Sequence, residues 1–451
     1  MDIYERHDYL GGRSTVVTVK DDPALGVIEL GASIFIEDNY NLMNATEKFG
    51  LKLKVLTEDD NGRGLGLWNG EEFIFEETGN YYWDVAKIIW RYGLSPMKLK
   101  RLVPIIIENF KAIYDNDATP FRDIPTVLER LNMEHLINAT AAEYLEDGQN
   151  FDQRFVREIV QTATRANYGQ DVHLLHAFGA LVSMAAAKGA WSVQGGNFLI
   201  FEEFVRRANA ELHLQTSVTS IQNVTDVDEH GLPVRRYIVT TANDESELYD
   251  AVILATPLHN AQIELPFANT DTHRTYHTVH VTLVAGVPNP GYFNRDKDTI
   301  PSFIVTTGHF ETENPPFTTF VVHRTIETGE SVVKMFSSKQ MTDDELDKLF
   351  YDRSWVYRHR WEAFPKLFPV TLKENTPDTW PSFVLDGFQE ETGSSEHGIV
   401  YVNAFENVIS TMETQTIAAK NAVKLIHGRW CGHSSSLKRG CVAFGDGWGG
   451  L

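Results

Sequence analysis

The chain has 451 residues, of which 42% are hydrophobic and 23% charged, and it contains no low-complexity tract. This length and composition indicate a globular protein with two domains or one two-lobed unit, not a disordered chain. The 62 acidic and 40 basic residues give a net charge of −22. That charge argues against nucleic acid as a partner and against a general attraction to anionic membrane.

The predicted elements mix strands and helices. In chain order we expect strands at 3–5, 15–19 and 27–30, helices between 81 and 114 that are split at Gly93 and Pro96, a helix at 152–167, a small-residue run at 177–187, a helix at 198–209, strands at 218–222, 236–241 and 251–255, an antiparallel block at 275–336, a strand at 399–403 and a helix at 411–426. This pattern predicts an α/β fold.

The cysteines and the apolar stretches exclude two further classes of protein. Cys431 and Cys441 cannot form a disulfide framework, and no Cys/His spacing is typical of a zinc site. The longest apolar stretch, near 174–187, is shorter than the roughly 20 residues that a membrane span needs. The sequence therefore predicts no transmembrane segment and leaves peripheral contact with a membrane open.

A short strand followed by a glycine-arginine turn opens the chain. In a dinucleotide-binding unit, an acidic residue at the end of the second strand accepts hydrogen bonds from the adenosine ribose. Glu5, followed by Arg6, stands where that acid belongs. The turn Gly11-Gly12-Arg13 would let the backbone approach a pyrophosphate while the guanidinium offsets its charge. A surface turn with an incidental arginine is the alternative.

Two further strands end in small residues. The strand at 27–30 runs into Gly31-Ala32-Ser33, and the strand at 251–255 ends in Ala255-Thr256-Pro257. Val218 begins another strand, whose backbone would face an adenine. Small residues let a chain pass close to a cofactor, and this combination recurs in FAD oxidoreductases. An ordinary buried parallel strand is the alternative explanation.

A strand-to-helix junction lies near the C-terminal end. Met412, Glu413 and Thr414 stand in the first turn of the helix predicted at 411–426. A helix N-terminus directed at a flavin stabilises negative charge on the reduced ring. We therefore predict that these three residues contact the cofactor, and the same helix can also pack against the core.

In this order and at these separations, the segments resemble the flavin amine-oxidase-like superfamily and, within it, the prenylcysteine oxidase family, also called prenylcysteine lyase. The resemblance extends to about residue 430. It is carried by Tyr4-Glu5-Arg6, Gly11-Gly12-Arg13, Trp90-Arg91-Tyr92-Gly93, Arg165-Ala166-Asn167-Tyr168-Gly169-Gln170, Gly189-Ala190-Trp191-Ser192-Val193-Gln194-Gly195-Gly196-Asn197, Ala255-Thr256-Pro257-Leu258-His259 and Ala418-Ala419-Lys420-Asn421-Ala422.

The resemblance implies an α/β fold with two domains. A discontinuous, Rossmann-like FAD-binding domain that lacks its N-terminal βα unit would comprise residues 1–36, 189–260 and 396–430. A substrate domain of the α+β type, which binds the prenyl group, would comprise residues 37–188 and 261–395. Residues 431–451 would form an atypical tail.

The resemblance also implies the reaction and the compartment. Members of the family oxidise the thioether of farnesyl- or geranylgeranyl-cysteine with FAD, O2 and water, and they release cysteine, a prenyl aldehyde and H2O2 as prenylated proteins are degraded. A flavin amine oxidase with another substrate and a non-catalytic prenyl- or lipid-binding relative are the alternatives. The family's mammalian members are lysosomal, so we expect a lysosome, a vacuole or another secretory-pathway lumen. Sequons at Asn44, Asn138 and Asn223 are compatible with such a glycoprotein, although no signal peptide opens the recorded sequence.

The residues that would handle the substrate are named by resemblance. They are Tyr168, Trp191, Gly195, Gly196 and Asn197. The apolar helices between 81 and 114 suit a long prenyl slot, and core packing explains any single residue there equally well.

The histidines supply only weak candidates for catalysis. His176 and His259 are candidate general bases by position alone. His273, His277 and His280 have the spacing of metal ligands on a helix, but their segment has the pattern of a strand. We therefore predict no metal site.

One feature departs from the family. Its members place a strand and a G-x-G-x-x-G loop about 20 residues before the ribose acid, where the loop binds the pyrophosphate. Here Glu5 is the fifth residue, so we expect that the sequence is a fragment or an incomplete gene model. Gly445, Gly447 and Gly450 match the glycine spacing, but no helix follows them.

Overall fold

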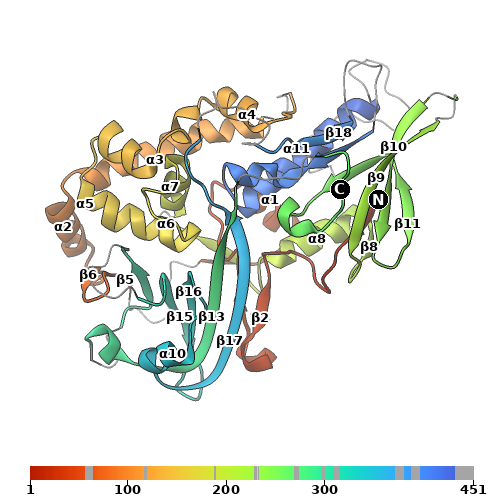
Figure 1. Ribbon diagram of the computed structural model, residues 1–451. Coiled ribbons are helices and arrows are strands. Elements are labelled where there is room, and N and C mark those ends of the chain that lie inside the picture. Colours follow the sequence, from red (N-terminus) through yellow and green to blue (C-terminus); the bar gives the residue numbers. More distant parts are fainter. Residues whose placement is uncertain are drawn as a thin grey trace.

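The computed structural model describes residues 1–55, 64–115, 119–186, 189–227, 231, 233–268, 274–296, 300–308, 315–370, 380–387 and 397–431. A group of helices lies along one side of a large sheet, and a smaller group of strands lies beyond the helices (Figure 1). The predicted α/β architecture is confirmed in this mixed form. The tail beyond 431, with Cys441 and the three glycines, lies outside the described residues.

The large sheet has the strand order β17-β13-β16-β15-β14-β5-β6. Its strands are β5 (Leu65–Trp68), β6 (Phe73–Glu76), β13 (Tyr276–Pro288), β14 (Phe303–Thr306), β15 (Thr319–Thr325), β16 (Ser331–Ser337) and β17 (Phe350–Pro365). Neighbours from β17 to β14 are antiparallel, whereas β5 runs parallel to β14. The antiparallel block predicted for 275–336 is therefore confirmed.

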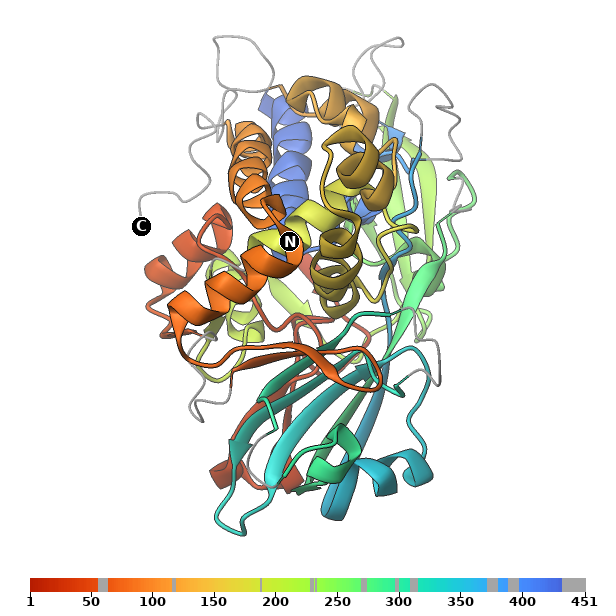
Figure 2. The ribbon, with the colours of Figure 1, turned by 90° about the vertical axis from the view of Figure 1, so that its left-hand side faces the viewer.

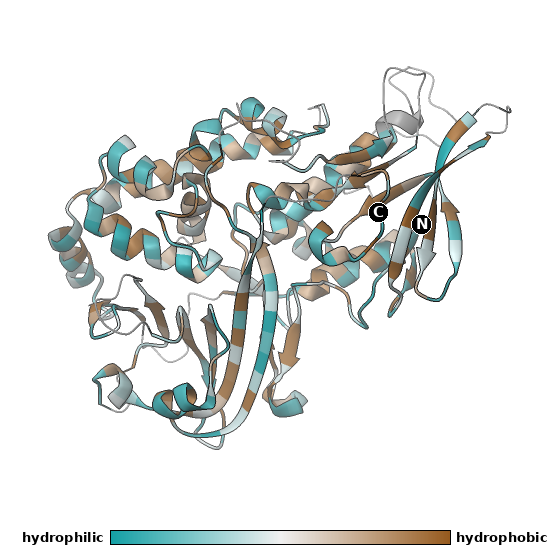
Figure 3. Ribbon diagram, in the orientation of Figure 1, coloured by the Kyte–Doolittle hydropathy of each residue, from teal (hydrophilic) through white to brown (hydrophobic). Residues whose placement is uncertain are grey.

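Apolar side chains on both faces hold this sheet in place. Along β13, Val281 and Leu283 pack with Ile28 on one face, and Val284 packs with Phe320 on the other. Successive residues of a strand point to opposite faces, so one strand supplies two cores. Figure 3 shows the resulting bands of hydropathy along β13 and β17.

The remaining strands form small sheets. They are β1 (Asp2–Tyr4), β2 (Val16–Thr18), β3 (Val27–Glu29), β4 (Leu53–Val55), β7 (Trp191–Val193), β8 (Glu211–His213), β9 (Val218–Val227), β10 (Pro233–Thr241), β11 (Ser246–Tyr249), β12 (Ala251–Leu254), β18 (Val384–Gly387) and β19 (Gly398–Tyr401). Two pairs are parallel, β1 with β8 and β12 with β19. The strands expected near 3–5, 251–255 and 399–403 are thus present, with ends shifted by one or two residues.

The helices of the described part begin and end as follows. They are α1 (Tyr40–Phe49), α2 (Tyr81–Tyr92), α3 (Ser95–Lys111), α4 (Ile124–Leu131), α5 (Gln153–Phe155), α6 (Gln161–Tyr168), α7 (Ala177–Ala185), α8 (Phe198–Ala208), α9 (Leu258–Ala261), α10 (Asp343–Leu349) and α11 (Met412–Cys431). The short helical segments are η1 (Val19–Asp21), η2 (Pro23–Leu25), η3 (Ala112–Tyr114), η4 (Glu134–Leu136), η5 (Glu143–Gly148), η6 (Val156–Val160), η8 (Pro290–Phe293) and η10 (Val402–Asn407). The π-helical segment η6 joins α5 to α6, so the helix predicted at 152–167 is continuous but locally widened.

The predicted split between α2 and α3 is confirmed. Gly93 follows the last residue of α2 with φ +59, which a glycine adopts without steric cost, and Pro96 lies in the first turn of α3. Leu99, Val103 and Ile106 of α3 are buried in the main core. In the described part of the chain, no helix is both long and apolar enough to cross a bilayer.

Helix α11 is held to the helical layer by a buried amide. The side chain of Asn421 accepts a hydrogen bond from the Phe121 amide at 2.9 Å and donates one to the Phe121 carbonyl at 2.8 Å. Ala418 and Ala422 of the same helix are completely buried. Three residues of the family-like segment, Ala418, Asn421 and Ala422, thus serve packing.

We predict that Asn421→Ala lowers the free energy of unfolding by about 2–4 kcal/mol, because it leaves two buried backbone groups unpaired. Urea denaturation followed by circular dichroism measures the change. Val423→Ala, at a half-exposed position on the same helix, is the control and should change stability by less than about 1 kcal/mol. An equal loss in both variants would contradict this role of the amide.

Candidate functional site

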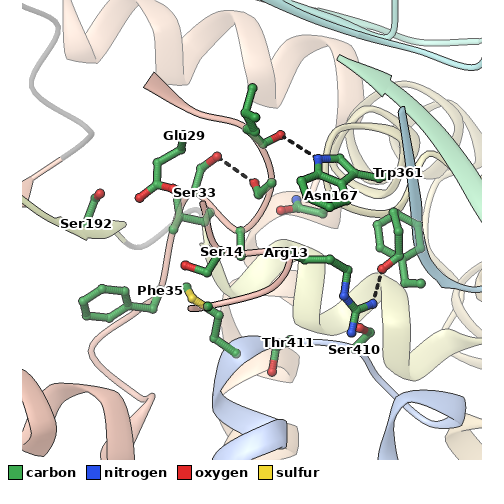
Figure 4. Close-up of a pocket in the computed structure, with 18 of the residues that line it drawn as sticks. Arg13, Ser14, Glu29, Ser33, Phe35, Asn167, Ser192, Trp361, Ser410 and Thr411 are labelled. Atoms are coloured by element: carbon green, nitrogen blue, oxygen red, sulfur yellow. Dashed lines mark hydrogen bonds between the residues drawn. The ribbon is translucent and has the colours of Figure 1, made fainter. Parts of the chain in front are cut away.

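A cavity of about 2820 Å³ runs through the middle of the molecule. Among the predicted cofactor residues, it is lined by Glu5, Arg6, Gly11, Gly12, Arg13, Gly31, Ala32, Ser33, Ala255, Thr256, Pro257, Met412 and Glu413. Val218 and Thr414 do not line it. Segments from both ends and from the middle of the chain therefore meet at one cavity, part of which Figure 4 shows.

Two backbone loops lie against each other at the wall of the cavity. The Ala32 amide donates to the Arg13 carbonyl at 3.1 Å, and a Cβ added to Gly31 would lie 2.1 Å from that oxygen. Gly11 has φ +103, and its added Cβ would lie 2.4 Å from the Ser14 carbonyl oxygen. Only glycine fits these two positions, because a side chain would push the loops apart.

Arg13 is paired inside the protein. Its guanidinium forms a salt bridge with the fully buried Glu406 and donates to the Ala363 carbonyl (Figure 4 shows the second bond). Glu406 also accepts hydrogen bonds from the Tyr276 hydroxyl and the Asn403 amide, both at 2.8 Å. The charge of Arg13 thus balances a buried carboxylate at the edge of the cavity, where the sequence suggested a pyrophosphate.

Glu413 and Thr414 have structural partners. The carboxylate of Glu413 accepts hydrogen bonds from the Asn41 and Leu42 amides at 2.8 and 3.0 Å, at the N-terminus of α1, and from the Tyr114 hydroxyl. Burial raises the pKa of this carboxyl group. Thr414 bonds to Thr411, which caps α11. The protein itself therefore occupies the polar side-chain atoms of Glu413 and Thr414, and contact of this helix start with a cofactor stays a prediction.

The N-terminus of α11 still borders the cavity. Ser410, Thr411 and Met412 all line it, and the first two are labelled in Figure 4. Amide groups and the helix dipole give such an end a positive potential. This end of the cavity is therefore suited to a group that develops negative charge.

A buried acid and a buried amine lie at the opposite wall, where the sequence gave no signal. The Lys334 ammonium donates to the Glu29 carbonyl at 2.6 Å and to the Ser33 hydroxyl at 2.8 Å. Oε1 of Glu29 accepts a hydrogen bond from the Asn197 backbone amide at 2.6 Å. Its Oε2 is buried without a partner in the described part of the chain. Burial raises the pKa of Glu29 to about 7 and lowers that of Lys334 to about 8.

We predict a pH-dependent loss of stability that depends on Glu29. The pKa of Glu29 in the folded protein lies above its ordinary value of 4.5. Its contribution to the free energy of unfolding is therefore fully present below pH 4.5 and is lost as the pH rises through about 7. Between pH 5 and 7.5 the free energy of unfolding of the wild type should fall by about 2–3 kcal/mol more than that of Glu29→Gln. The glutamine keeps an oxygen that accepts the hydrogen bond from the Asn197 backbone amide. Urea denaturation at both pH values measures the difference. Glu327→Gln, at an exposed acid, should behave like the wild type, and an identical pH dependence in Glu29→Gln would refute the prediction.

The cavity continues into an apolar chamber between α6 and the large sheet. Helix α6 packs across β14, and Arg165 of α6 donates to Thr306 of β14 at 3.3 Å. The apolar residues of the chamber are Ile159, Ala163 and Ala166 on the helical side, and Leu65, Leu67, Phe303, Val305, Val321 and Phe336 on the sheet. Polar residues of the same elements, Thr162, Arg165, Thr319, His323 and Lys334, also line the cavity. No residue of 81–114 lines this cavity, so a prenyl slot between those helices would not be part of it and stays a prediction. Apolar periodicity there reflects packing against the core.

The predicted substrate residues divide into two groups. Tyr168, Gly195 and Gly196 line the cavity, whereas Trp191 and Asn197 do not. Tyr168 is buried, packs edge-on against Phe364 at 5.3 Å between ring centroids, and donates to the Ser410 carbonyl at 3.4 Å.

Asn197 does not line the cavity but connects two backbone segments that do. Its side chain accepts from the Val193 amide at 2.8 Å and donates to the Ala32 carbonyl at 2.9 Å. The buried amide thereby holds the 193–196 turn against the loop that contains Ala32. The role that the structure gives to Asn197 is to position these backbones.

Neither candidate base lines the cavity. His176 is completely buried, and its Nδ1 accepts from the Gly179 amide at 3.2 Å, so it caps α7. Burial lowers its pKa to about 3, which keeps the ring neutral. The ring of His259 packs against that of Tyr276 at a tilt of 38°, with 3.9 Å between the centroids, beside the Arg13–Glu406 pair. His176 is therefore a structural residue, and His259 adjoins the polar end of the cavity.

Two of the three spaced histidines, His277 and His280, are described by the structure, and they do not share a ligand geometry. His277 and His280 lie on β13, as expected, and a separation of three residues along a strand turns their side chains to opposite faces. His277 borders the cavity, where its ring stacks on Phe364. His273 lies outside the described residues.

The lining residues fit a large dinucleotide cofactor. Gly11 and Gly31 let two backbone loops close against each other at the wall, Glu5 offers a carboxylate, and the α11 N-terminus lies further along the same cavity. The Ser14 hydroxyl is buried at the cavity wall and has no hydrogen-bond partner among the described residues. Buried hydroxyls are normally satisfied, so a bound polar ligand would supply the partner.

Comparisons with known proteins agree on one family. A family model described as prenylcysteine lyase matches residues 75–438. Farnesylcysteine lyase of Arabidopsis thaliana is 29% identical, over 97% of this chain and 85% of that protein. Prenylcysteine oxidase 1 of Homo sapiens is 27% identical with the same coverage, and its relative prenylcysteine oxidase 1-like is 28% identical over 95% and 85%.

Solved structures of putrescine oxidase share the fold. A redesigned triple mutant superposes with a TM-score of 0.56 at 12% identity, covering 94% of this chain and 93% of that chain. The wild-type enzyme bound to putrescine gives 0.54 at the same identity and coverage. This likeness extends over nearly the whole of both chains and concerns the fold alone.

Proposed function

The chain belongs to the prenylcysteine lyase family and is a flavin-dependent oxidoreductase, and from this premise we propose that it is an FAD-dependent thioether oxidase of prenylcysteine. The reaction converts farnesyl- or geranylgeranyl-cysteine, water and O2 into cysteine, the prenyl aldehyde and H2O2. In it, the carbon next to sulfur loses a hydride, water adds to that carbon, and the C–S bond breaks. FAD, when bound, would accept the hydride and pass the electrons to O2.

The main support for the proposal is that one cavity has a polar part and an apolar part that are connected. Glycine loops, Glu5 and the α11 N-terminus line one part, and the apolar chamber against α6 lines the other. We propose that the parallel pairs β1–β8 and β12–β19 belong to a Rossmann-like FAD domain, and that the chamber receives the isoprenoid chain. If the isoprenoid chain of prenylcysteine lies in the chamber, the carbon next to sulfur would lie where the chamber meets the polar part.

The chamber favours an isoprenoid over a diamine. Leu67, Val305 and Phe336 offer no charge to an ammonium group. A desolvated ammonium would need a partner, and the carboxylates that line the cavity, such as Glu29 and Glu77, lie outside this set of residues. A farnesyl chain gains about 0.8 kcal/mol for each methylene that such a surface buries. The physical chemistry of the chamber therefore agrees with the names of the relatives rather than with a polyamine substrate.

The chain's own residues would orient and shield the reaction. Two hydrogen bonds hold β17 against the loops of the polar part (Figure 4). Arg13 donates to the Ala363 carbonyl, and the Trp361 indole donates to the Leu30 carbonyl at 3.3 Å. Tyr168 and Phe364 lie where the chamber meets this part. These buried groups restrict the entry of water, and the α11 N-terminus favours negative charge near Met412.

The purified protein should show a flavin absorption spectrum that bleaches when farnesylcysteine is added without oxygen. Admission of air should restore the spectrum and release H2O2 and farnesal in equal amounts. Putrescine is the comparison substrate and should do neither. Peroxide release with putrescine alone would identify an amine oxidase, and binding of farnesylcysteine by a protein without flavin would identify a non-catalytic relative.

Blocking the chamber should impair only long substrates. We predict that Ala163→Trp lowers kcat/KM for farnesylcysteine at least about 10-fold, mostly through KM, because the indole occupies space that the chain needs. Cysteine bearing a five-carbon prenyl group should be affected less. Ala242→Trp, on an exposed turn, is the control. Equal losses for both substrates would place the isoprenoid elsewhere.

A further inference from the structure

Helices α2 and α3 present large apolar side chains to solvent. Trp90 is 88% exposed and Tyr82 is 84% exposed. The other exposed residues of this set are Tyr81, Trp83, Ile89, Leu94, Met97 and Ile105. Together these residues are called the aromatic patch. Eight exposed large apolar side chains on and between two helices that contact each other are unusual on a soluble surface and indicate an interaction site.

The patch occupies the outer side of the helix pair. In α2, Tyr82, Ile89 and Trp90 share one face, and in α3, Met97 and Ile105 are eight residues apart on another exposed face. Helix α2 lies at the edge of the helical layer in Figure 1, and the orange pair of helices faces the viewer in Figure 2.

The opposite side of α2 already anchors it to the protein. Arg91 forms two hydrogen bonds of 2.7 Å with the carboxylate of Glu158, and the buried Tyr92 donates to the same carboxylate at 2.8 Å. The aromatic patch is therefore not needed to seat the helix, and it remains available to a partner.

The charge of this segment is opposite to that of the chain as a whole. Residues 81–107 contain five basic residues and one acidic residue, and the whole chain carries −22. Arg91 is balanced by Glu158, so the other four basic residues and the one acidic residue leave a net charge of +3. Lys87 lies 5.9 Å from the ring centroid of Trp83, so charge and aromatic surface are adjacent. A basic, aromatic surface on an acidic protein is complementary to an anionic one.

We propose that the aromatic patch docks the protein peripherally on an anionic lipid bilayer. Trp and Tyr side chains favour the interface between headgroups and acyl chains, and nearby Lys and Arg are attracted by anionic lipid. Lys87, Lys100 and Arg101 would meet the headgroups while Trp83 and Trp90 insert. The two helices would lie in the plane of the interface, and neither would cross it.

The patch is close in the chain to the walls of the cavity. Glu77, which lines the cavity, precedes α2 by four residues, and Glu158, which binds α2, adjoins the chamber residue Ile159. Docking would thus hold the chamber near a membrane. The docking itself does not rest on the proposed enzymatic function, because it can be measured without any substrate.

The test is sedimentation of the full chain with vesicles at low ionic strength. One set of vesicles contains phosphatidylcholine alone, and the other contains about one-third phosphatidylserine. The variants are W83A/W90A and K100Q/R101Q. The controls are Tyr351→Ala, an aromatic residue 68% exposed on β17, and Lys339→Gln, an exposed lysine after β16. Circular dichroism and thermal melting verify that each variant is folded.

The wild type should bind the anionic vesicles, and added salt should weaken that binding. Each double variant should reduce the partition coefficient on the order of 10-fold, and the two controls should leave it unchanged. Absence of wild-type binding to anionic vesicles would overturn the proposal, as would equal binding by all variants. So would a dimer in gel filtration that W83A/W90A converts to a monomer without any effect on the vesicles, because the patch would then contact a second copy. None of these outcomes depends on flavin or on turnover.

Discussion

A single buried carboxylate, that of Glu406, connects segments that lie far apart in the chain. It is paired with Arg13 and hydrogen-bonded to Tyr276 and Asn403, and Arg13 reaches in turn to the Ala363 carbonyl. A carboxylate without these partners would be very costly in the interior. The loop after β1, the start of β13, the end of β17 and η10 must therefore meet at one place. The cavity forms beside this meeting point.

The long strands β13 and β17 carry this constraint into the rest of the molecule. Near the end of β17, Trp361 bonds to the Leu30 carbonyl, and Phe364 packs on Tyr168 beside the chamber. One strand thus borders both the polar and the apolar part of the cavity. A substrate with a polar amino acid at one end and an isoprenoid at the other needs these two surroundings in a fixed relation.

Some features of the fold could be predicted because their causes are local. Gly93 and Pro96 end one helix and begin the next through their own backbone preferences. The alternation along 275–336 predicted antiparallel strands, and in β13 side chains on opposite faces do enter different cores. The glycines at 11 and 31 also marked a close approach of backbones, although the approach is to Arg13 and Ser14 of the same protein.

Other features depended on contacts between distant residues. The apolar faces of α2 and α3 were visible in the sequence, but periodicity does not tell whether the core, a ligand or solvent covers an apolar face. The chamber instead lies where α6 crosses β14, a contact across 141 residues that joins Arg165 to Thr306. The buried pair of Glu29 and Lys334 could not be predicted either, because packing and not their neighbours in sequence creates their environment.

The sequence alone determined the class of elements, the turns that require glycine and the resemblance to one enzyme family, because each of these depends on residues close together or on motifs that stay intact. The tertiary structure decided which charges are paired. Glu413 begins a helix as expected, yet its carboxylate binds the amides of α1, and Arg13 is matched to Glu406. Electrostatic partners depend on distance in space and on burial, and only the folded chain sets these.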